Sequence, residues 1–589
     1  MANKFPTNQS FQRLNNMPLD ETVVFDNLAQ AQNYANNNPT AYRGQVVHVK
    51  DARNPSEISE GVFIYEETCY IDLLKNVKPI CSFTYEAMGM FFDLMYEIIN
   101  NPTEETRAKV DTLKEIMYDN YAYDFNEIPT GDYHTQPWHP ANYNEYQICL
   151  KMTTGQCSDN RIGSGYFGAQ GAGYRTEDIR FRDDNYNDYY YKVITFNSGQ
   201  LPTKISFKNG DCIEKVIHMC DTSKLTDMKE MFYNCKALTT IEDANKWNTS
   251  NVTDMQWMFN GCVALAALDL SGWDTSNVTT MIHMFDNCTA LTTIGDVSTW
   301  DTSNITDMYA MFHNCQSLTS LNINNWNIEN VIDITSMFEN CKALTTLDLS
   351  DWNTSQIGTK KDLYGDQSFL VSGIFSGCES LVSLNLSNWN LSNIKTLRYA
   401  FQNCKSLINL DISNWNVPNL YRLEKTFLGC SSLIDLDLSV LSKDNALYLG
   451  YTFSECSSLK NLIGIENWIV FDTSRTFSGC SSFEELDLTS WKTSTLVDIS
   501  EMFKNCSSLQ SINLSGWNTE AVLRLTRIFA GCTSLEYLDV SGWKFNNRID
   551  YNNAEGFDSC DALEWENINT TGCDDRTISI LNTIYQASI

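Results

Sequence analysis

The chain has 589 residues and a formal net charge of −32 at neutral pH, and no cluster of Lys and Arg offsets its acidity. Such a surface repels the phosphates of nucleic acids, which argues against nucleic-acid binding. The sequence has no apolar run long enough to predict a membrane-spanning helix, and residues 1–20 lack the apolar core of a secretory signal peptide.

The first 80 residues predict a small α+β module. Residues 22–25, 45–49 and 62–65 have the pattern of short strands, and residues 27–36 carry apolar side chains at helical spacing. The stretch TVVFDNLAQAQNYANNNPTAYRGQVVHVKD resembles the N-terminal modules of tailed-phage virion proteins, especially those of gut bacteriophages. This resemblance implies docking to other virion proteins, with assembly in the host cytoplasm and exposure outside the cell.

Residues 81–122 predict a helical hairpin. Its second helix would begin after Thr103, whose side chain can accept a hydrogen bond from a free N–H group, with Glu104 and Glu105 in its first turn. A hairpin of this kind could pack against sister subunits. We therefore expect a homo-oligomer, with a trimer among the options.

Residues 123–200 are rich in aromatic residues, glycine and asparagine and predict a β region. Glycines at 163, 165 and 168 match a phosphate-binding loop, but no apolar strand precedes them, so a plain glycine-rich loop is the favoured interpretation. Four further residues could supply zinc ligands, although their spacing does not fit the common structural sites: His134, His139, Cys149 and Cys157. We expect no enzyme activity, no cofactor and no metal.

A repeat array with an N-terminal cap is predicted for residues 201–568. Thirteen copies of a Phe-x-x-Cys pattern follow one another at intervals of 24 to 28 residues, with one interval of 37. A fixed period in this range predicts a stacked solenoid, with residues 569–589 as a C-terminal cap. The repeat phenylalanines lie at positions 232, 259, 285, 312, 338, 375, 401, 427, 453, 477, 503, 529 and 557.

One repeat shows how the pattern would fold. Leu268 and Leu270 alternate with Asp269, which predicts a short strand with the leucines inside. Residues 274–277 (DTSN) would cap a helix at 278–285. The residue before the repeat cysteine is Asn or Gly in eleven of thirteen repeats, the types that best tolerate the left-handed conformation that ends a helix. We expect the cysteines to be buried free thiols, in a core that includes Phe285, Cys288, Phe312, Cys315, Phe338 and Cys341.

These residues resemble the BspA-like leucine-rich repeats of bacterial surface proteins, whose signature reads M-F-x-x-C-x-x-L-x-x-L-D-L-S-x-W-D-T-S-N-V-T-D-M. The match covers about residues 213–558. The resemblance implies a right-handed solenoid of strands and helices, adhesion to cells or matrix in several members, and no catalysis. The predicted fold class is therefore α/β, a leucine-rich-repeat solenoid of about thirteen turns preceded by the α+β module, the helical hairpin and the β region.

Two surfaces of the array are candidates for ligand binding. Polar side chains point outward from successive strands, and they either keep the sheet soluble or bind sugar hydroxyls or Ca²⁺. This polar strand row includes Asp348, Asp411, Asp437, Asp487 and Asp539. The insertion at 356–370 lengthens one repeat and is not needed by the core. It contains Lys360, Lys361, Tyr364 and Asp366. The regular tryptophans are either packed corners or, alternatively, platforms for sugars.

The hypothesis that joins these parts is a bacteriophage virion protein, such as a tail fibre, head fibre or decoration protein, whose solenoid recognises the host surface. Its partners would be other virion proteins at the N-terminal module and a host cell-surface glycan or protein at the solenoid. The alternative is a bacterial or protist cell-surface adhesin of the leucine-rich-repeat type. An enzyme with a solenoid specificity domain would need a catalytic site within residues 123–200.

Overall fold

The computed structural model describes most of the C-terminal array and parts of the N-terminal regions. The chain forms two compact units, residues 1–143 with 182–187 and residues 144–181 with 188–589. The predicted helices at 27–36 and within 81–122, and the predicted strand at 62–65, lie outside the described residues. The described residues are 19–25, 46–49, 67–71, 77–79, 146–153, 161–162, 165–182, 188–197, 200–359, 371–441, 444–551 and 555–588.

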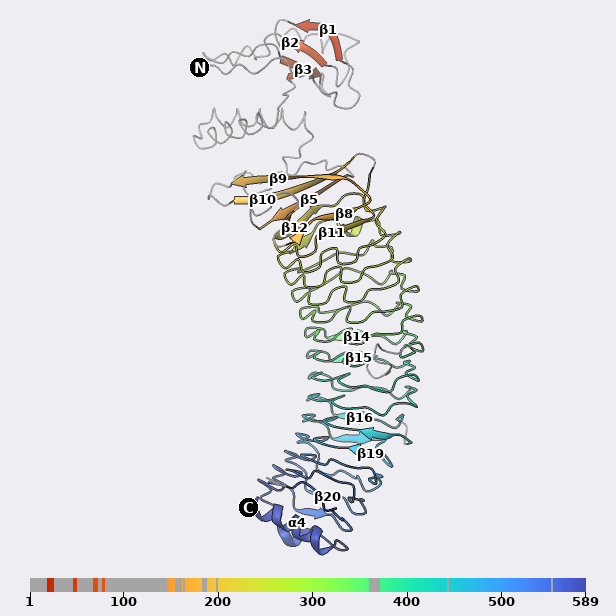
Figure 1. Ribbon diagram of the computed structural model, residues 1–589, viewed down its shortest axis with the longest axis vertical. Coiled ribbons are helices and arrows are strands. Elements are labelled where there is room, and N and C mark those ends of the chain that lie inside the picture. Colours follow the sequence, from red (N-terminus) through yellow and green to blue (C-terminus); the bar gives the residue numbers. More distant parts are fainter. Residues whose placement is uncertain are drawn as a thin grey trace. The chain divides into compact units, whose positions relative to one another are not determined.

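The described part of the first unit is a four-stranded sheet (Figure 1). β1 (Leu19–Phe25) pairs in parallel with β2 (Val46–Val49). β3 (Glu67–Ile71) pairs antiparallel with both β2 and β4 (Val77–Pro79). The strands predicted at 22–25 and 45–49 are confirmed.

The second unit begins with a five-stranded sheet. The strands follow the order β13 (Thr240–Ile241), β12 (Ile213–His218), β5 (Gln147–Met152), β10 (Asp188–Phe196) and β9 (Tyr174–Arg182). β12 pairs antiparallel with β5 on one side and parallel with β13 on the other. Because β13 belongs to the first solenoid turn, this sheet covers the open N-terminal end of the array. Short strands nearby are β6 (Arg161–Ile162), β7 (Gly165–Tyr166), β8 (Gly168–Gln170) and β11 (Lys204–Ser206).

The predicted solenoid of about thirteen turns is confirmed, and its turns pair in parallel (Figure 1). The array ends in α4 (Asp575–Gln586), whose first turn is capped by the Asp574 carboxylate. The described residues contain no helix long and apolar enough to span a membrane. The other regular elements are η2 (Ala244–Lys246), β14 (Thr346–Asp348), β15 (Ser383–Asn385), β16 (Asp435–Asp437), β17 (Ala446–Tyr448), β18 (Asn461–Ile463), β19 (Ile469–Asp472), β20 (Ser511–Asn513), β21 (Tyr537–Asp539), η3 (Trp565–Asn567) and β22 (Ile568–Asn569).

Ladders of identical side chains form the solenoid core. The repeat phenylalanines stack on one another through the whole array, with ring centroids 5.4 to 5.9 Å apart. Each repeat cysteine is a buried free thiol. From Cys262 on, its Sγ donates to the carbonyl oxygen of the repeat phenylalanine one turn earlier, as Cys288 does to Phe259 at 3.1 Å. The same contacts therefore fix the alignment of each turn on the turn before it.

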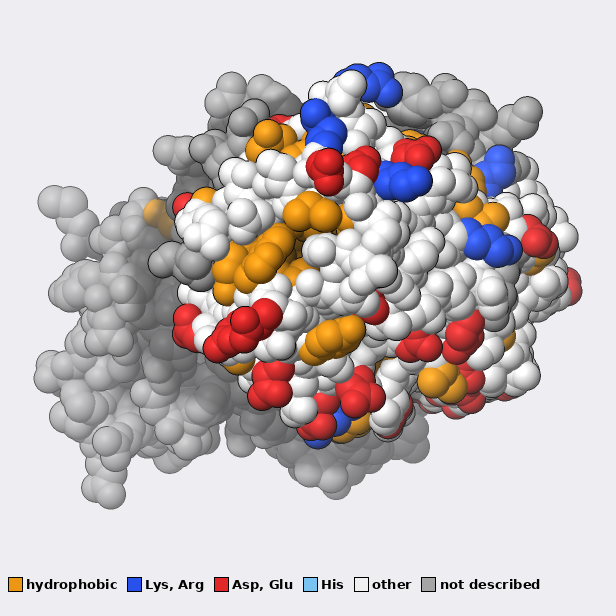
Figure 2. Space-filling view, turned by 90° about the horizontal axis from the view of Figure 1, so that it is seen from below, with side chains coloured by type: hydrophobic (Ala, Val, Ile, Leu, Met, Phe, Trp, Pro, Cys, Tyr) orange, Lys and Arg blue, Asp and Glu red, His pale blue; other side chains and the backbone are white. Residues whose placement is uncertain are grey.

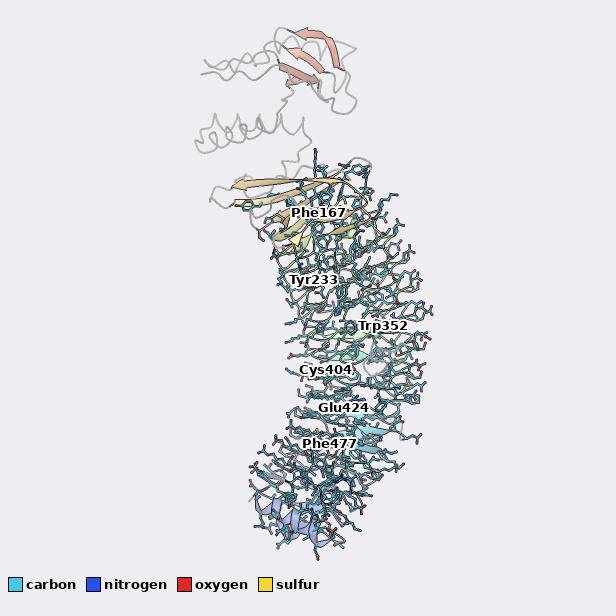
Figure 3. All side chains as sticks on the ribbon, in the orientation of Figure 1. Phe167, Tyr233, Trp352, Cys404, Glu424 and Phe477 are labelled. Carbon is cyan, nitrogen blue, oxygen red and sulfur yellow. The ribbon has the colours of Figure 1, made fainter. Side chains whose placement is uncertain are left out.

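The repeat tryptophans are packed corners. Trp300 and Trp326 are at most 3% exposed, and their rings stack with centroids 5.7 Å apart. Trp326 Nε1 donates to the carbonyl oxygen of Val297 in the preceding turn at 3.0 Å. Rings buried in this way leave no free face for a sugar. In Figure 3, Trp352 lies toward one side of the solenoid and Cys404 toward the other.

The helix predicted in each repeat is wrong: the described residues of the thirteen repeats contain no α-helix. In the segment after residue 278, His283 has φ 53° and Asn287 has φ 60°, so a right-handed helix cannot pass through either. The Met284 N–H bonds within its own turn, whereas the N–H groups of His283 and Phe285 donate to the next turn at 2.9 Å. The spacing of apolar residues that suggested a helix instead places their side chains inside these alternating turns.

The DTSN motif is a corner, not a helix cap. Asp274 accepts the Ser276 N–H at 3.0 Å, as predicted for a capping residue, but a tight turn follows. Thr275 Oγ1 donates forward to the Asp301 carbonyl and Asn277 Nδ2 donates back to the Ser250 carbonyl, both at 2.8 Å. These side chains therefore connect three successive turns.

Candidate functional site: a column of left-handed residues

The polar strand row lies on the outer face of the sheet, as its alternation with buried leucines predicts. Asp348, Asp411, Asp437 and Asp487 are exposed, and Asp539 is half-buried. Each carboxylate accepts the N–H of the residue two positions later, at 2.8 to 3.0 Å. The row therefore closes the corner that follows each strand.

Hydrogen bonding sets the electrostatics of this row. Bonds from Ser439 and Thr489 hold the pKa of Asp437 and Asp487 below its usual value. Across the described part of the chain, no three His, Cys, Asp or Glu side chains meet as a metal ion would require. The geometry gives the calcium interpretation no support.

The other candidate residues predicted from the sequence do not form a binding site within the described residues. Lys360, Lys361, Tyr364 and Asp366 lie outside the described residues. Gly165 and Gly168 lie in the short strands β7 and β8, and neither strand leads into a helix that could hold a phosphate. Cys149 is buried in β5, while His134, His139 and Cys157 lie outside the described residues.

Two fixed positions of the repeat carry left-handed residues, the first in all thirteen turns and the second in twelve, since Glu555 of the last turn is not left-handed. The first lies two residues after the repeat phenylalanine, with φ between 57° and 79° in all thirteen turns, which confirms the predicted left-handed conformation. We call this position the Asn/Gly column. The second lies two residues before the phenylalanine, with φ between 50° and 65°. We call it the left-handed column. It consists of Glu230, Trp257, His283, Ala310, Ser336, Gly373, Tyr399, Lys425, Tyr451, Arg475, Glu501 and Arg527.

The two columns share a backbone conformation but differ in composition. A non-glycine residue in the left-handed region costs roughly 1–2 kcal/mol, and Asn and Gly tolerate it best. The Asn/Gly column follows this rule in eleven of its thirteen turns, with Glu455 and Ser559 as the exceptions, whereas the left-handed column contains Trp, Tyr, Lys and Arg and only one glycine. The backbone therefore does not explain these side chains. Bulky residues held in costly conformations concentrate at functional sites.

The N-terminal part of the left-handed column carries an aromatic and histidine cluster. The Trp257 ring stacks on His283 with centroids 6.0 Å apart, and Tyr309 meets His283 edge-on at 4.9 Å. The Asp286 carboxylate is buried and lies 2.9 Å from His283 Nδ1 and 2.6 Å from His313 Nδ1. Burial opposes the charged forms, but these contacts outweigh it, so the pKa of His313 is raised and that of Asp286 is lowered.

The C-terminal part alternates rings and cations. Lys425 Nζ lies between Tyr399 and Tyr451, 5.4 Å from each ring centroid. The Arg475 guanidinium lies 5.0 Å from the Tyr451 ring, and its Nη1 donates to the Tyr451 hydroxyl at 2.8 Å. Arg475 also pairs with Glu501 at 2.5 Å. These side chains are half-buried, so each still presents atoms to solvent.

Charge is uneven along and around the array. Acidic residues flank the left-handed column in the N-terminal turns, and Glu230 lies in the column itself; the flanking acids are Asp227, Asp254, Asp286, Asp307, Asp333 and Glu339. Cations are frequent there in the C-terminal turns, with Arg398, Arg422, Lys425, Arg475, Lys504, Arg524 and Arg527. Seen from the C-terminal end, the lower half of the molecule is mainly acidic, and most Lys and Arg side chains lie in the upper half (Figure 2).

A family model described as a Mycoplasma protein of unknown function, DUF285, matches residues 203–294, 290–373, 370–472 and 448–570. No curated protein matches the chain. Among solved structures, the chain is similar to a leucine-rich cell surface protein from Faecalibacterium prausnitzii, at 15% identity over 66% of this chain and 88% of that one, with a TM-score of 0.23. It is also similar to the TLR13 chain of a complex with ssRNA13, at 17% identity over 62% of this chain, with a TM-score of 0.18. It spans 65% of that TLR13 chain.

Proposed function

The chain belongs to the DUF285 family, and we propose that its solenoid is a recognition module that binds a cell-surface ligand through the left-handed column. The contrast between the two columns carries this proposal. In the Asn/Gly column most residues are types that tolerate the left-handed backbone. In the left-handed column most residues are types that disfavour it, and they present aromatic rings, cations and acids. The phenylalanine and cysteine ladders hold that display in fixed register, which suits an extended binding surface.

The chemistry of the left-handed column favours a polar ligand. Rings beside charged groups, as at Tyr451 and Arg475, provide hydrogen bonds and cation–π contacts but no deep apolar cavity. A host-surface glycan or protein fits such a surface, and each contact would be weak. Several copies of the array would strengthen binding through multivalency.

We further propose that a tailed-phage virion carries the array, with the N-terminal region docked to other virion proteins and the chain in a homo-oligomer. The support is the sequence resemblance at residues 22–51. The alternative, a bacterial or protist cell-surface adhesin, uses the same left-handed column and differs in what holds the N-terminus. Mass spectrometry of purified particles separates the two, since a virion component must be present in stoichiometric amount.

The recognition proposal is tested by binding of the labelled full-length chain to a panel of intact gut bacteria. One variant replaces Trp257, Tyr399 and Tyr451 by glycine, and a matched variant replaces Asp348, Asp411 and Asp437 by asparagine in the polar strand row. We expect a loss of at least about tenfold for the first variant, comparable to losing one or two anchor residues, and little change for the second. Undiminished binding of the first variant would refute the proposal.

A further inference from the structure

Lys425 differs from Arg398, Arg422 and Arg475 in having no acidic partner among the described residues. Its Nζ is held by two rings, Tyr399 and Tyr451. Among the described residues, no carboxylate lies within ion-pair distance of it, although the chain has 73 Asp and Glu against 41 Lys and Arg. The nearest acid in sequence, Glu424, contacts Arg422 at 2.8 Å and Arg398 at 3.8 Å through its Oε1, and its Oε2 is buried without a hydrogen-bond partner.

The surroundings prepare Lys425 for an incoming anion. Two flanking rings fix the ammonium group and exclude part of its water, so an anionic partner would gain more there than at a free surface lysine. The backbone of Lys425 is also left-handed, with φ 58°, a conformation that costs less conformational energy for glycine or asparagine than for lysine. Lys425 thus combines a strained backbone, an ordered ammonium group and an unsatisfied charge.

Cations recur in the left-handed column at every second turn. After Lys425 come Arg475 and Arg527, with Tyr451 and Glu501 in the turns between them. Arg475 pairs with Glu501 and Arg527 with Glu555, so of these three cations Lys425 alone has no carboxylate partner among the described residues. At a strand spacing of about 4.8 Å per turn, successive cations lie about 10 Å apart along the axis. A polymer with an acidic group at regular intervals matches this spacing, whereas the charges of a folded protein surface have no such period.

We propose that Lys425 is the anion subsite of the recognition surface, that Arg475 and Arg527 extend it along the same column by sharing their guanidinium groups between Glu501 and Glu555 and the ligand, and that this ligand is an acidic polysaccharide. This inference rests on the proposed recognition function and adds the ligand class. The subsite binds carboxylate or phosphate groups of the polymer, while the Tyr399 and Tyr451 rings keep the ammonium group in place. Because the rest of the chain is acidic, the polymer binds only at this subsite. The affinity falls as the salt concentration rises, since salt screens the attraction between the cations and the polymer.

The test measures binding of the full-length chain to four polymers: a polyuronate, a phosphate-bearing teichoic polymer, neutral dextran and polyglutamate. Lys425→Gln removes the charge, and Lys425→Arg keeps it. Lys405→Gln is the matched control, because Lys405 is an exposed cation paired with Glu379 outside the left-handed column. We expect Lys425→Gln to weaken binding to one acidic polysaccharide at least about tenfold, while Lys425→Arg and Lys405→Gln stay within about twofold of the native chain.

The polyuronate and teichoic arms distinguish a carboxylate from a phosphate ligand. Equal losses for Lys425→Gln and Lys405→Gln, tighter binding to polyglutamate than to either polysaccharide, or no binding to any acidic polymer would overturn the subsite. Cell binding of the same variants keeps the two proposals apart. If Lys425→Gln binds cells normally while the glycine variant of the left-handed column does not, the anion subsite fails and the recognition function stands.

Discussion

Arg527 and Gly531 offer a direct test of the strain argument, because both are left-handed residues of one turn. Arg527→Gly relieves roughly 1–2 kcal/mol of left-handed strain, adds about 1 kcal/mol of chain entropy cost, and loses an exposed ion pair with Glu555 that is worth about 0–1 kcal/mol. These effects nearly cancel. We expect the free energy of unfolding to change by no more than about 1 kcal/mol.

Gly531→Ala should behave differently although it is the smaller change. Gly531 has φ 79°, and an added Cβ would lie 2.3 Å from Asn505 Oδ1 in the preceding turn. Left-handed strain of roughly 1–2 kcal/mol and a comparable overpacking cost give a loss of about 2–4 kcal/mol.

The measurement is urea unfolding of the full-length chain by tryptophan fluorescence, with hydrogen exchange to localise the change to the turns around residues 503–557. Gly531→Ala should lower the midpoint and increase exchange in those turns, and Arg527→Gly should do neither. Equal destabilisation by the two changes would show that the Arg527 side chain serves the fold, and the argument from strain would fail.

Three further outcomes follow from the core and from the histidine cluster. Phe312→Ala should lower the free energy of unfolding by roughly 3–5 kcal/mol, because the ring is fully buried and stacks on both neighbouring rings at 5.4 and 5.9 Å. Asp348→Ala should lower it by no more than about 1 kcal/mol. Equal losses would mean that the inner and outer faces are misassigned. Because folding raises the pKa of His313, its contact with Asp286 stabilises fully below about pH 6.5 and less as pH rises through the folded pKa. The stability difference between the native chain and His313→Asn should therefore shrink as the pH rises above about 6.5, and a constant difference would contradict the pairing. Native repeat cysteines such as Cys235 and Cys378 should resist thiol reagents, since burial raises their pKa to about 12, whereas the hydrogen bond with Cys532 lowers the pKa of Cys560. The denatured, non-reduced chain should titrate nearly all of its 20 cysteines, and half that number would indicate disulfides.

The repeat was predictable because its core residues repeat by type. A phenylalanine and a cysteine equivalent to Phe285 and Cys288 recur in every turn. The Asn or Gly before eleven of the thirteen cysteines predicted a left-handed residue that the structure confirms. The helix prediction failed at His283, since nothing in a histidine indicates a left-handed backbone. Side-chain period alone cannot separate a helix from two tight turns that bury the same face.

The candidate site was harder to predict for the same reason. Column residues such as Trp257 and Lys425 share no residue type, so alignment of the repeats shows them only as variable positions. Their common feature is a backbone angle, and it becomes visible only in the structure. The sequence pattern indicated the polar strand row as the candidate binding surface instead, because Asp recurs there. The recurring Asp closes a turn, a structural need that every repeat shares.

Hydrogen bonding between turns explains how the left-handed column can carry costly residues. The N–H groups of His283 and Phe285 donate to the next turn, and Tyr451 and Arg475 make the same kind of bond. Each left-handed residue thus belongs to a ladder that continues above and below it, so the backbone angle is fixed by neighbouring turns and not by the residue itself. A substitution there changes the local energy by about 1 kcal/mol without changing the angle. The core fixes the conformation and leaves the side chain open to change, which is the separation that a recognition surface requires.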